Sequence, residues 1–173
     1  ALKYCLNCKR CEVACPSNVR IGDIIQLARI KYSKSKPKVR DFILSHTDLV
    51  GSVATYMSPV VNSVLRLKPT KVVLDSVFSI DKQRTFPAYS FGTFESWMKK
   101  QTESQKHYKQ QVAFFHGCYV NYNNPALGKD LVRVMNAFGI GVRLLKEEKC
   151  CGVALISNGF IKQAKKQAAV NLK

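Results

Sequence analysis

The sequence lacks a hydrophobic run long enough to cross a membrane. The apolar stretch 49–65 has no charged residue, but it is only 17 residues long and contains glycine, proline, serine, threonine and asparagine. A membrane-spanning helix needs about 20 consecutive apolar residues, so we expect no transmembrane segment. The apolar side chains of 49–65 could instead lie at a membrane interface, or be buried as a connector between other elements. The sequence begins at Ala1 without an initiator methionine, and we expect no signal peptide in the residues that follow.

Acidic residues are also scarce, with 11 Asp and Glu against 28 Lys and Arg, which gives a net charge of +17. The basic residues gather in three stretches, 31–40, 99–109 and 162–166. Nucleic acid, an anionic membrane surface or an acidic protein subunit could each bind such a chain. Because we find no module that interleaves basic and aromatic residues to bind nucleic acid, we expect no nucleic-acid partner. A basic face that only contacts solvent is the alternative.

Internal repeats and low-complexity segments are absent, but cysteine is concentrated near the start of the chain. Four of the seven cysteines stand in the run C-L-N-C-K-R-C-E-V-A-C-P, at Cys5, Cys8, Cys11 and Cys15. The spacing C-x2-C-x2-C-x3-C-P is typical of bacterial ferredoxins and predicts a [4Fe–4S] cluster and electron transfer. In two-cluster ferredoxins the fourth cysteine ligates the other cluster. We therefore expect Cys5, Cys8 and Cys11 to share one cluster and Cys15 to ligate a second.

A second motif of this kind is missing, although a cubane needs four ligands. The first ligand is only the fifth residue, so we expect the partner motif upstream, in a part of the protein that precedes Ala1. The alternative to a cluster is zinc, but zinc sites favour two C-x2-C pairs separated by a longer loop. Thiols that serve as ligands must stay reduced, which favours the cytosol.

The pattern of apolar residues changes near residue 110. Before it, helices are expected at 21–32, 71–80 and 93–108, with shorter helical pieces after 41 and a break at the polar residues 34–37. After it, short apolar runs at 112–115 and 142–145 predict two strands. A helix begins between them at Asn124 and Pro125 and ends before Gly139, and a further helix follows at 159–172. We therefore predict an α-helical ferredoxin-like domain over 1–110, followed by an incomplete α/β (βαβα) cysteine-rich domain over 111–173.

The other three cysteines follow the two predicted strands. Cys118 comes after the first strand, and Cys150, Cys151 and Gly152 come after the second. If the strands are parallel, both loops emerge at the carboxyl edge of the sheet, where ligands of α/β sheets bind. This placement favours a redox or iron–sulfur role over incidental cysteines. Nearby, His116 could donate to a sulfur or move a proton to a quinone, or it could be a structural histidine.

Charged residues also lie inside the first cysteine loop. Lys9 and Arg10 stand between the predicted ligands Cys8 and Cys11. Positive charge beside a cluster stabilises its reduced, more negative form and raises its potential. The alternative is that both side chains point to solvent and shift the potential little.

The pattern C-x31-C-C-G from Cys118 to Gly152 resembles the first half of the cysteine-rich domain of heterodisulfide reductase B subunits. The same domain occurs in the iron–sulfur subunits of glycolate and lactate oxidases. In this family the domain continues with a C-x2-C beyond the point where the present chain ends. The resemblance implies a further cluster at this site, or a quinone or disulfide substrate close to it.

Longer segments resemble the iron–sulfur C subunits of bacterial anaerobic glycerol-3-phosphate dehydrogenases. The resemblance covers essentially all 173 residues and is carried by A-L-K-Y-C-L-N-C-K-R-C-E-V-A-C-P-S, I-G-D-I-I-Q, F-I-L-S-H-T-D-L-V-G-S-V, Y-S-F-G-T-F, Q-V-A-F-F-H-G-C-Y-V-N-Y-N, L-G-K-D-L-V-R-V and K-C-C-G-V. It implies two [4Fe–4S] clusters in the intact protein. It also implies flavoprotein A and B subunits as partners and menaquinone as the electron acceptor. The location that it implies is peripheral, on the cytoplasmic face of the bacterial inner membrane, and the basic surplus suits an anionic membrane surface there.

Three functions therefore remain open at the level of the sequence. The main hypothesis is a non-catalytic electron-transfer subunit that also anchors its complex at the membrane. The second is a heterodisulfide-reductase-like subunit in which Cys118, Cys150 and Cys151 take part in disulfide or quinone chemistry. The third is a basic interaction module that binds zinc.

Overall fold

The computed structural model describes residues 5, 7–32 and 39–172, and it divides into two compact units. One unit comprises 1–46 together with 151–173, and the other comprises 47–150. The predicted break at 34–37 lies outside the described residues. The predicted boundary at 110, between a ferredoxin-like and a cysteine-rich domain, remains a prediction.

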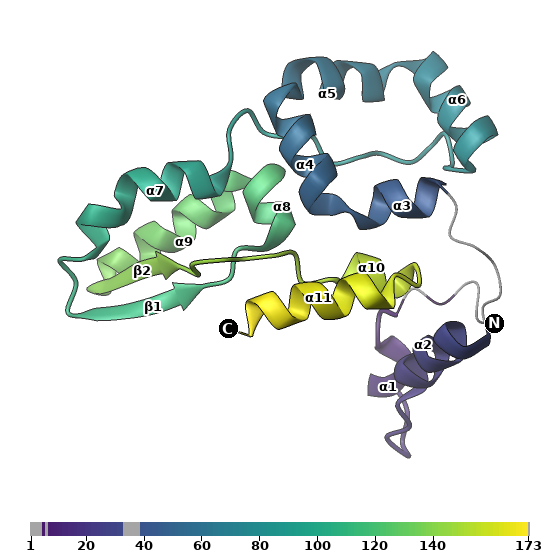
Figure 1. Cartoon of the computed structure of the whole chain (residues 1–173), viewed down its shortest axis with the longest axis horizontal. Helices are drawn as coiled ribbons and strands as arrows, with labels where there is room; N and C mark the ends of the chain where they lie inside the picture. Colours follow the sequence, from purple (N-terminus) through teal and green to yellow (C-terminus); the bar gives the residue numbers. More distant parts are fainter. Residues whose placement is uncertain (1–4, 6, 33–38, 173) are drawn as a thin grey trace. The chain divides into compact units, whose positions relative to one another are not determined.

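The unit that carries the first cysteine loop is helical in its described part (Figure 1). Its helices are α1 (Arg10–Val13), α2 (Ile21–Tyr32), α3 (Val39–Ser45), α10 (Val153–Ser157) and α11 (Ile161–Asn171). α2 has the bounds expected from the sequence. The helix expected at 159–172 is confirmed as α11, but the short helix α10 before it was not predicted. α3 packs on α10, and the Ser45 hydroxyl donates to the Ala154 carbonyl at 3.3 Å.

The other unit contains the sheet and the remaining helices. Its helices are α4 (Thr47–Tyr56), α5 (Ser58–Arg66), α6 (Lys68–Phe78), α7 (Phe94–Gln105), α8 (Gly117–Tyr122) and α9 (Pro125–Ala137). Its strands are β1 (Gln110–Phe114) and β2 (Ile140–Leu144), which pair in parallel with Val112 opposite Val142. The parallel pair that the sequence predicted is therefore present, displaced by one or two residues. The ferredoxin-like arrangement of the helical region remains a prediction.

Capping residues fix the crossover between the strands as expected. The Asn124 side chain accepts a hydrogen bond from the Leu127 N–H, and Pro125 begins α9. At the other end, Gly139 has φ +74°, a left-handed conformation that glycine adopts without a steric penalty. α9 then packs against β2, and α7 packs against the same strand (Figure 1).

The core of this unit lies between α7, α9 and the sheet. Four buried side chains form it, Phe94, Met98, Val132 and Val142. Gly128 of α9 permits this packing, because a Cβ there would lie 2.6 Å from the Phe94 ring. One buried polar side chain takes part, since Gln105 accepts a hydrogen bond from the Val142 N–H at 3.0 Å.

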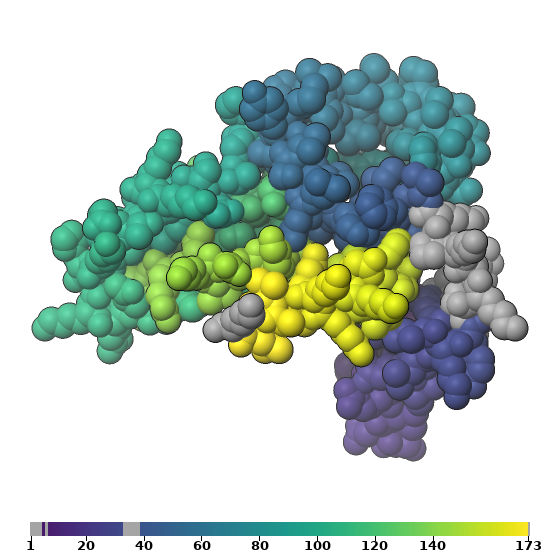
Figure 2. All heavy atoms as spheres, in the orientation of Figure 1, coloured from purple at the N-terminus to yellow at the C-terminus, as the bar shows by residue number. Residues whose placement is uncertain are grey.

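Helices α4 and α5 contain the segment 49–65, which the sequence left open between an interface and a buried connector, and α6 follows them. Small residues on α4 and α5 are buried. Most of the larger apolar side chains of α4–α6 are exposed, whereas Val50, Val61 and Leu65 are half-buried. The exposed set comprises Leu49, Val53, Tyr56, Met57, Val60, Val64, Leu67, Val72, Val73 and Val77. In Figure 2 the atoms of 58–78, which form α5 and α6, are the steel-blue to teal spheres of this unit. Within the described residues, no helix is long and apolar enough to cross a membrane.

Candidate metal centres

The first candidate centre is the loop that carries Cys5, Cys8, Cys11 and Cys15, all of which are free thiols. Cys8 and Cys11 are exposed, and Cys5 and Cys15 are half-buried. Two residues between these cysteines, Asn7 and Lys9, adopt left-handed backbone angles with φ of 53° and 62°. Such angles are uncommon for residues other than glycine and turn the chain sharply around Cys8. Cys5 and Cys8 therefore lie on a tight loop, Cys11 lies in the short helix α1, and Cys15 follows that helix.

Backbone N–H groups donate to two of the sulfurs. The Asn7 N–H donates to Cys5 Sγ, and the Val19 N–H donates to Cys15 Sγ, each at 3.4 Å. Hydrogen bonds to cysteine sulfur are one of the factors that set the potential of an iron–sulfur cluster. The donor set, thiols with N–H groups directed at them, therefore fits a cluster chemically.

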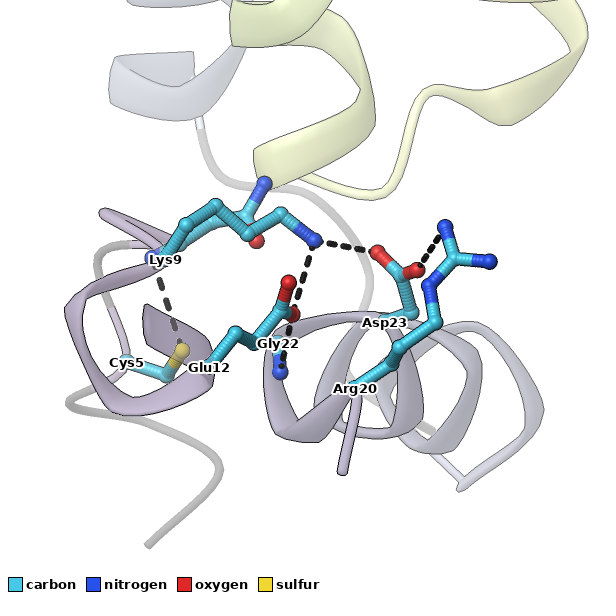
Figure 3. A network of polar contacts seen from close by, with 7 residues as sticks. Cys5, Lys9, Glu12, Arg20, Gly22 and Asp23 are labelled. Carbon is cyan, nitrogen blue, oxygen red and sulfur yellow. Dashed lines mark hydrogen bonds and ion pairs between the residues drawn. The ribbon is translucent and has the colours of Figure 1, made fainter. Parts of the chain in front are cut away.

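A network of charged residues braces the same loop against α2 (Figure 3). The Lys9 ammonium contacts Asp23 and lies 3.0 Å from Glu12, and Arg20 lies 2.6 Å from Asp23. Glu12 also accepts from the Gly22 N–H at 2.9 Å. Hydrogen bonding to Asp23 and Glu12 raises the pKa of Lys9, and the Lys9 ammonium holds the pKa of Asp23 below its usual value. The Lys9 ammonium is thus paired with the carboxylates of Asp23 and Glu12. The sequence left two alternatives for this charge, an effect on the cluster potential or a side chain that points to solvent, and the ion pairs match neither of them fully.

The second candidate centre brings Cys118 and Cys150 together in the other unit. Cys118 lies in the first turn of α8, directly after β1, and Cys150 follows β2. Their sulfurs are 3.7 Å apart, and Cys150 is buried while Cys118 is half-buried. The hydrogen bond with Cys150, and then burial, raise the pKa of the Cys118 thiol. The parallel strands therefore place these two cysteines face to face, as their positions in the sequence predicted.

Cys151 and Gly152 belong to the unit that carries the first cysteine loop. The Cys151 side chain is exposed. Gly152 precedes α10 with φ +80°, a left-handed angle that favours glycine in the C-C-G motif. The role of both residues as site residues remains a prediction.

A carboxylate that the sequence did not reveal joins the two strand-end loops. Glu148 accepts hydrogen bonds from the backbone N–H groups of Gly117 at 2.8 Å and His116 at 3.4 Å. It also lies 3.2 Å from the His116 ring, and both side chains are over 90% buried. His116 therefore contacts a carboxylate, which favours the structural interpretation of this histidine over a sulfur donor.

Two residues at the start of α4 also contact the second centre. The Thr47 hydroxyl donates to Cys150 Sγ at 3.2 Å, and Asp48 accepts from the Cys150 N–H at 3.0 Å. Both lie more than 100 residues before Cys150 in the sequence. Only their place in the segment F-I-L-S-H-T-D-L-V-G-S-V, which carries part of the resemblance, could have drawn attention to them.

A cleft of about 670 Å³ opens beside this centre. Its wall includes His116, Cys118 and Cys150 together with both acidic and basic side chains. The charged residues are Asp48, Glu95, Lys99, Lys106, Arg143, Lys146, Glu147, Glu148 and Lys149. The cysteine pair is thus adjacent to a polar space that a cluster or a small charged molecule could enter.

In the described part of the chain, no three cysteine, histidine or acidic side chains converge on the position of one metal ion. A cubane places each thiolate on a different iron, so its ligands lie farther apart than those of a single ion. The four thiols of the first loop, with N–H groups donating to two of them, therefore fit a cubane although they do not converge on one point.

Comparisons with known proteins give one family match over part of the chain and several similar proteins. Residues 112–173 match the family described as Cysteine-rich domain (CCG). Over 172 residues the chain is 61% identical to the C subunit of anaerobic glycerol-3-phosphate dehydrogenase from Escherichia coli K12, a match that covers 99% of this chain and 43% of the relative. An uncharacterized iron–sulfur protein of Methanocaldococcus jannaschii is 29% identical over 157 residues, which is 90% of this chain and 25% of the relative.

A third relative is the glycolate oxidase iron–sulfur subunit of E. coli K12, 26% identical over 154 residues, or 87% of this chain and 34% of the relative. The chain thus spans less than half the length of these curated relatives. No solved structure gives a significant match.

Proposed function

Since residues 112–173 match the cysteine-rich domain family and the whole chain resembles the C subunit of anaerobic glycerol-3-phosphate dehydrogenase, we propose that the protein is an iron–sulfur electron-transfer subunit. The observation that carries this proposal is the combination of 61% identity with the ferredoxin spacing of Cys5, Cys8, Cys11 and Cys15. Its role is to pass electrons along rather than to transform a substrate.

The cysteine-rich domain and the iron–sulfur relatives support [4Fe–4S] clusters as the cofactors. Such a cluster accepts and releases one electron at a time at a potential that its protein surroundings set. In this chain the four loop thiols would hold iron. The N–H groups of Asn7 and Val19 would donate to the thiolate sulfurs, and the ion pairs of Lys9 would keep the loop in place.

The finer proposal concerns the partners of the protein. Electrons would enter from flavin-containing A and B subunits that oxidise glycerol 3-phosphate and would leave to menaquinone. The protein would sit peripherally on the cytoplasmic face of the inner membrane and hold the complex there. The net charge of +17 and the exposed apolar side chains of α4–α6 support contact with an anionic lipid surface.

A second candidate function is heterodisulfide-reductase-like chemistry at the second centre. The D subunit of a heterodisulfide reductase from Methanosarcina mazei is 32% identical over 101 residues, which is 53% of this chain and 25% of the relative. The 3.7 Å approach of Cys118 and Cys150 beside a polar cleft favours redox chemistry at that position. In this case the centre itself would react with a disulfide or quinone rather than only relay electrons.

Anaerobic reconstitution tests the main proposal. The protein would be loaded with iron and sulfide, and its iron, acid-labile sulfide and zinc contents measured together with the EPR spectrum after reduction by dithionite. Equal amounts of iron and sulfide with the signal of a reduced cubane are expected. Zinc without sulfide would instead identify the zinc-binding interaction module.

The crossed ligation of the first motif has its own test in the full-length protein. Cys15→Ser should weaken one cluster signal, whereas substitution of Cys5, Cys8 or Cys11 by serine should weaken the other. EPR of each reduced variant distinguishes the two signals. Loss of one and the same signal in all four variants would show that the four cysteines hold a single cluster.

A further inference from the structure

We propose that Thr47 and Asp48, at the start of α4, are positioning residues of the Cys118–Cys150 centre. Both lie outside residues 112–173, which match the cysteine-rich domain. The role of Thr47 in setting a cluster potential rests on the proposed iron–sulfur function. The role of Asp48 in holding Cys150 does not depend on a bound cluster.

The two residues hold Cys150 at different atoms. Asp48 accepts the backbone N–H of Cys150 at 3.0 Å and thereby fixes the main chain. Thr47 donates its hydroxyl proton to Cys150 Sγ at 3.2 Å and thereby fixes the side chain. Since Cys150 is only 5% exposed, these groups replace water as the partners of its polar atoms. With both contacts made, the sulfur is aimed at Cys118, 3.7 Å away.

The position of α4 is itself fixed against the helix that carries Cys118. α4 packs on α8, and the buried Gly51 lies against the ring of Tyr122, where a Cβ would clash. The start of α4 is therefore held next to the cysteine pair by packing and not only by the two hydrogen bonds. This rigidity is what a residue needs in order to orient another group precisely.

A hydrogen bond to cysteine sulfur has a direct electronic consequence. It stabilises the more negative, reduced form of a bound cluster and so raises the midpoint potential. Thr47 is thus expected to raise the potential of a cluster ligated by Cys150. Asp48 is expected to govern the order of the loop around Cys150.

Labelling of the metal-free chain with iodoacetamide tests Asp48 without any cluster. Asp48→Ala removes the acceptor of a charge-assisted hydrogen bond, so Cys150 should be alkylated about tenfold faster, as resolved by peptide mass spectrometry. Asp48→Asn keeps an oxygen acceptor and should restore the protection. Ser52→Ala, an exposed position on the same helix, is the matched control, and the exposed Cys8 is the internal reference. Equal labelling of Cys150 in the wild-type and Asp48→Ala proteins would overturn the proposal.

Thr47 is tested in the cluster-loaded, full-length protein. Thr47→Val removes the hydroxyl at nearly constant volume and should lower the midpoint potential in a redox titration followed by EPR, and Thr47→Ser should restore it. An unchanged midpoint potential in the Thr47→Val protein would overturn the proposal. This test remains decisive if the Asp48→Ala protein does not fold. If the protein takes up no iron and sulfide at all, the proposed function fails, while the labelling of Cys150 still decides the role of Asp48.

Discussion

Among single residues, Glu148 connects the loop that follows β1 with the loop that follows β2. Its carboxylate satisfies two backbone N–H groups and contacts the His116 ring, and both side chains are over 90% buried at the wall of the cleft. A buried donor that loses its acceptor costs about 1–3 kcal/mol. The shape of the second centre therefore depends on a residue that is not itself a predicted ligand.

We expect Glu148→Ala to lower the free energy of unfolding by about 1–3 kcal/mol, because it leaves the N–H groups of His116 and Gly117 without their acceptor. Glu148→Gln keeps one oxygen acceptor and should cost less. Urea denaturation of the two variants measures the difference. Glu147→Ala, at an exposed neighbouring position, serves as the control, and an equal loss in that variant would contradict a specific role for Glu148.

How far the sequence predicted these residues depends on the range of the interactions. The cysteines were found because their spacing is a local pattern, and Cys118 and Cys150 were paired because parallel strands bring their carboxyl ends together. Thr47, Asp48 and Glu148 were not found. Their hydrogen bonds join residues 31 to 103 positions apart, and polar residues of these types are common on any surface.

Among the elements, those with local signals were predicted well. The ends of α9 are set by local features. Its start has the side-chain cap of Asn124 and the fixed φ of Pro125, and its end has the left-handed turn at Gly139. All three depend only on near neighbours in the sequence. The short helices α8 and α10 were missed. They have six and five residues, too few for an apolar period to appear.

The packing of α9 on α7 gives a prediction at this scale. Gly128→Ala would improve the helical propensity of α9, but its Cβ would lie 2.6 Å from the Phe94 ring and 2.8 Å from Val120. Overpacking of this kind typically costs about 1–3 kcal/mol, so we expect a net loss of stability in denaturant unfolding. In a Phe94→Leu background the same substitution should cost less, because the smaller side chain leaves room. An equal cost in both backgrounds would show that this contact does not limit the packing.

At the scale of the whole molecule, the charge is the property that the sequence gives completely. The surplus of 17 positive charges exists wherever the side chains lie, and it predicts binding to an anionic partner in general. Which surface binds depends on the fold. The exposed basic residues Arg66 and Lys68, at the end of α5 and the start of α6, flank the exposed apolar residue Leu67. The exposed lysines of α11 have no exposed large apolar residue beside them in the sequence.

We expect the protein to bind vesicles that contain phosphatidylglycerol, and to be released as salt rises. Replacing Arg66 and Lys68 by Gln should weaken binding by about 1 kcal/mol for each side chain. Sedimentation with vesicles measures the effect, and Lys162→Gln with Lys165→Gln on α11 is the matched control. If the α11 variant loses as much binding as the other, the lipid contact involves charge in general and not the α5–α6 surface.

The hydrogen bond between Gln105 and the Val142 N–H also bears on aggregation. A strand that exposes its N–H groups can pair with another chain and start an ordered aggregate. Here the Gln105 side chain of α7 accepts the hydrogen bond of the Val142 N–H on β2. A strand from another chain could pair at this position only after displacing Gln105. We therefore expect Gln105→Leu to increase light scattering on mild heating, while Lys100→Ala, at an exposed position on the same helix, leaves the scattering unchanged. The side-chain amide of Gln105 thus protects this part of β2 from pairing with another chain.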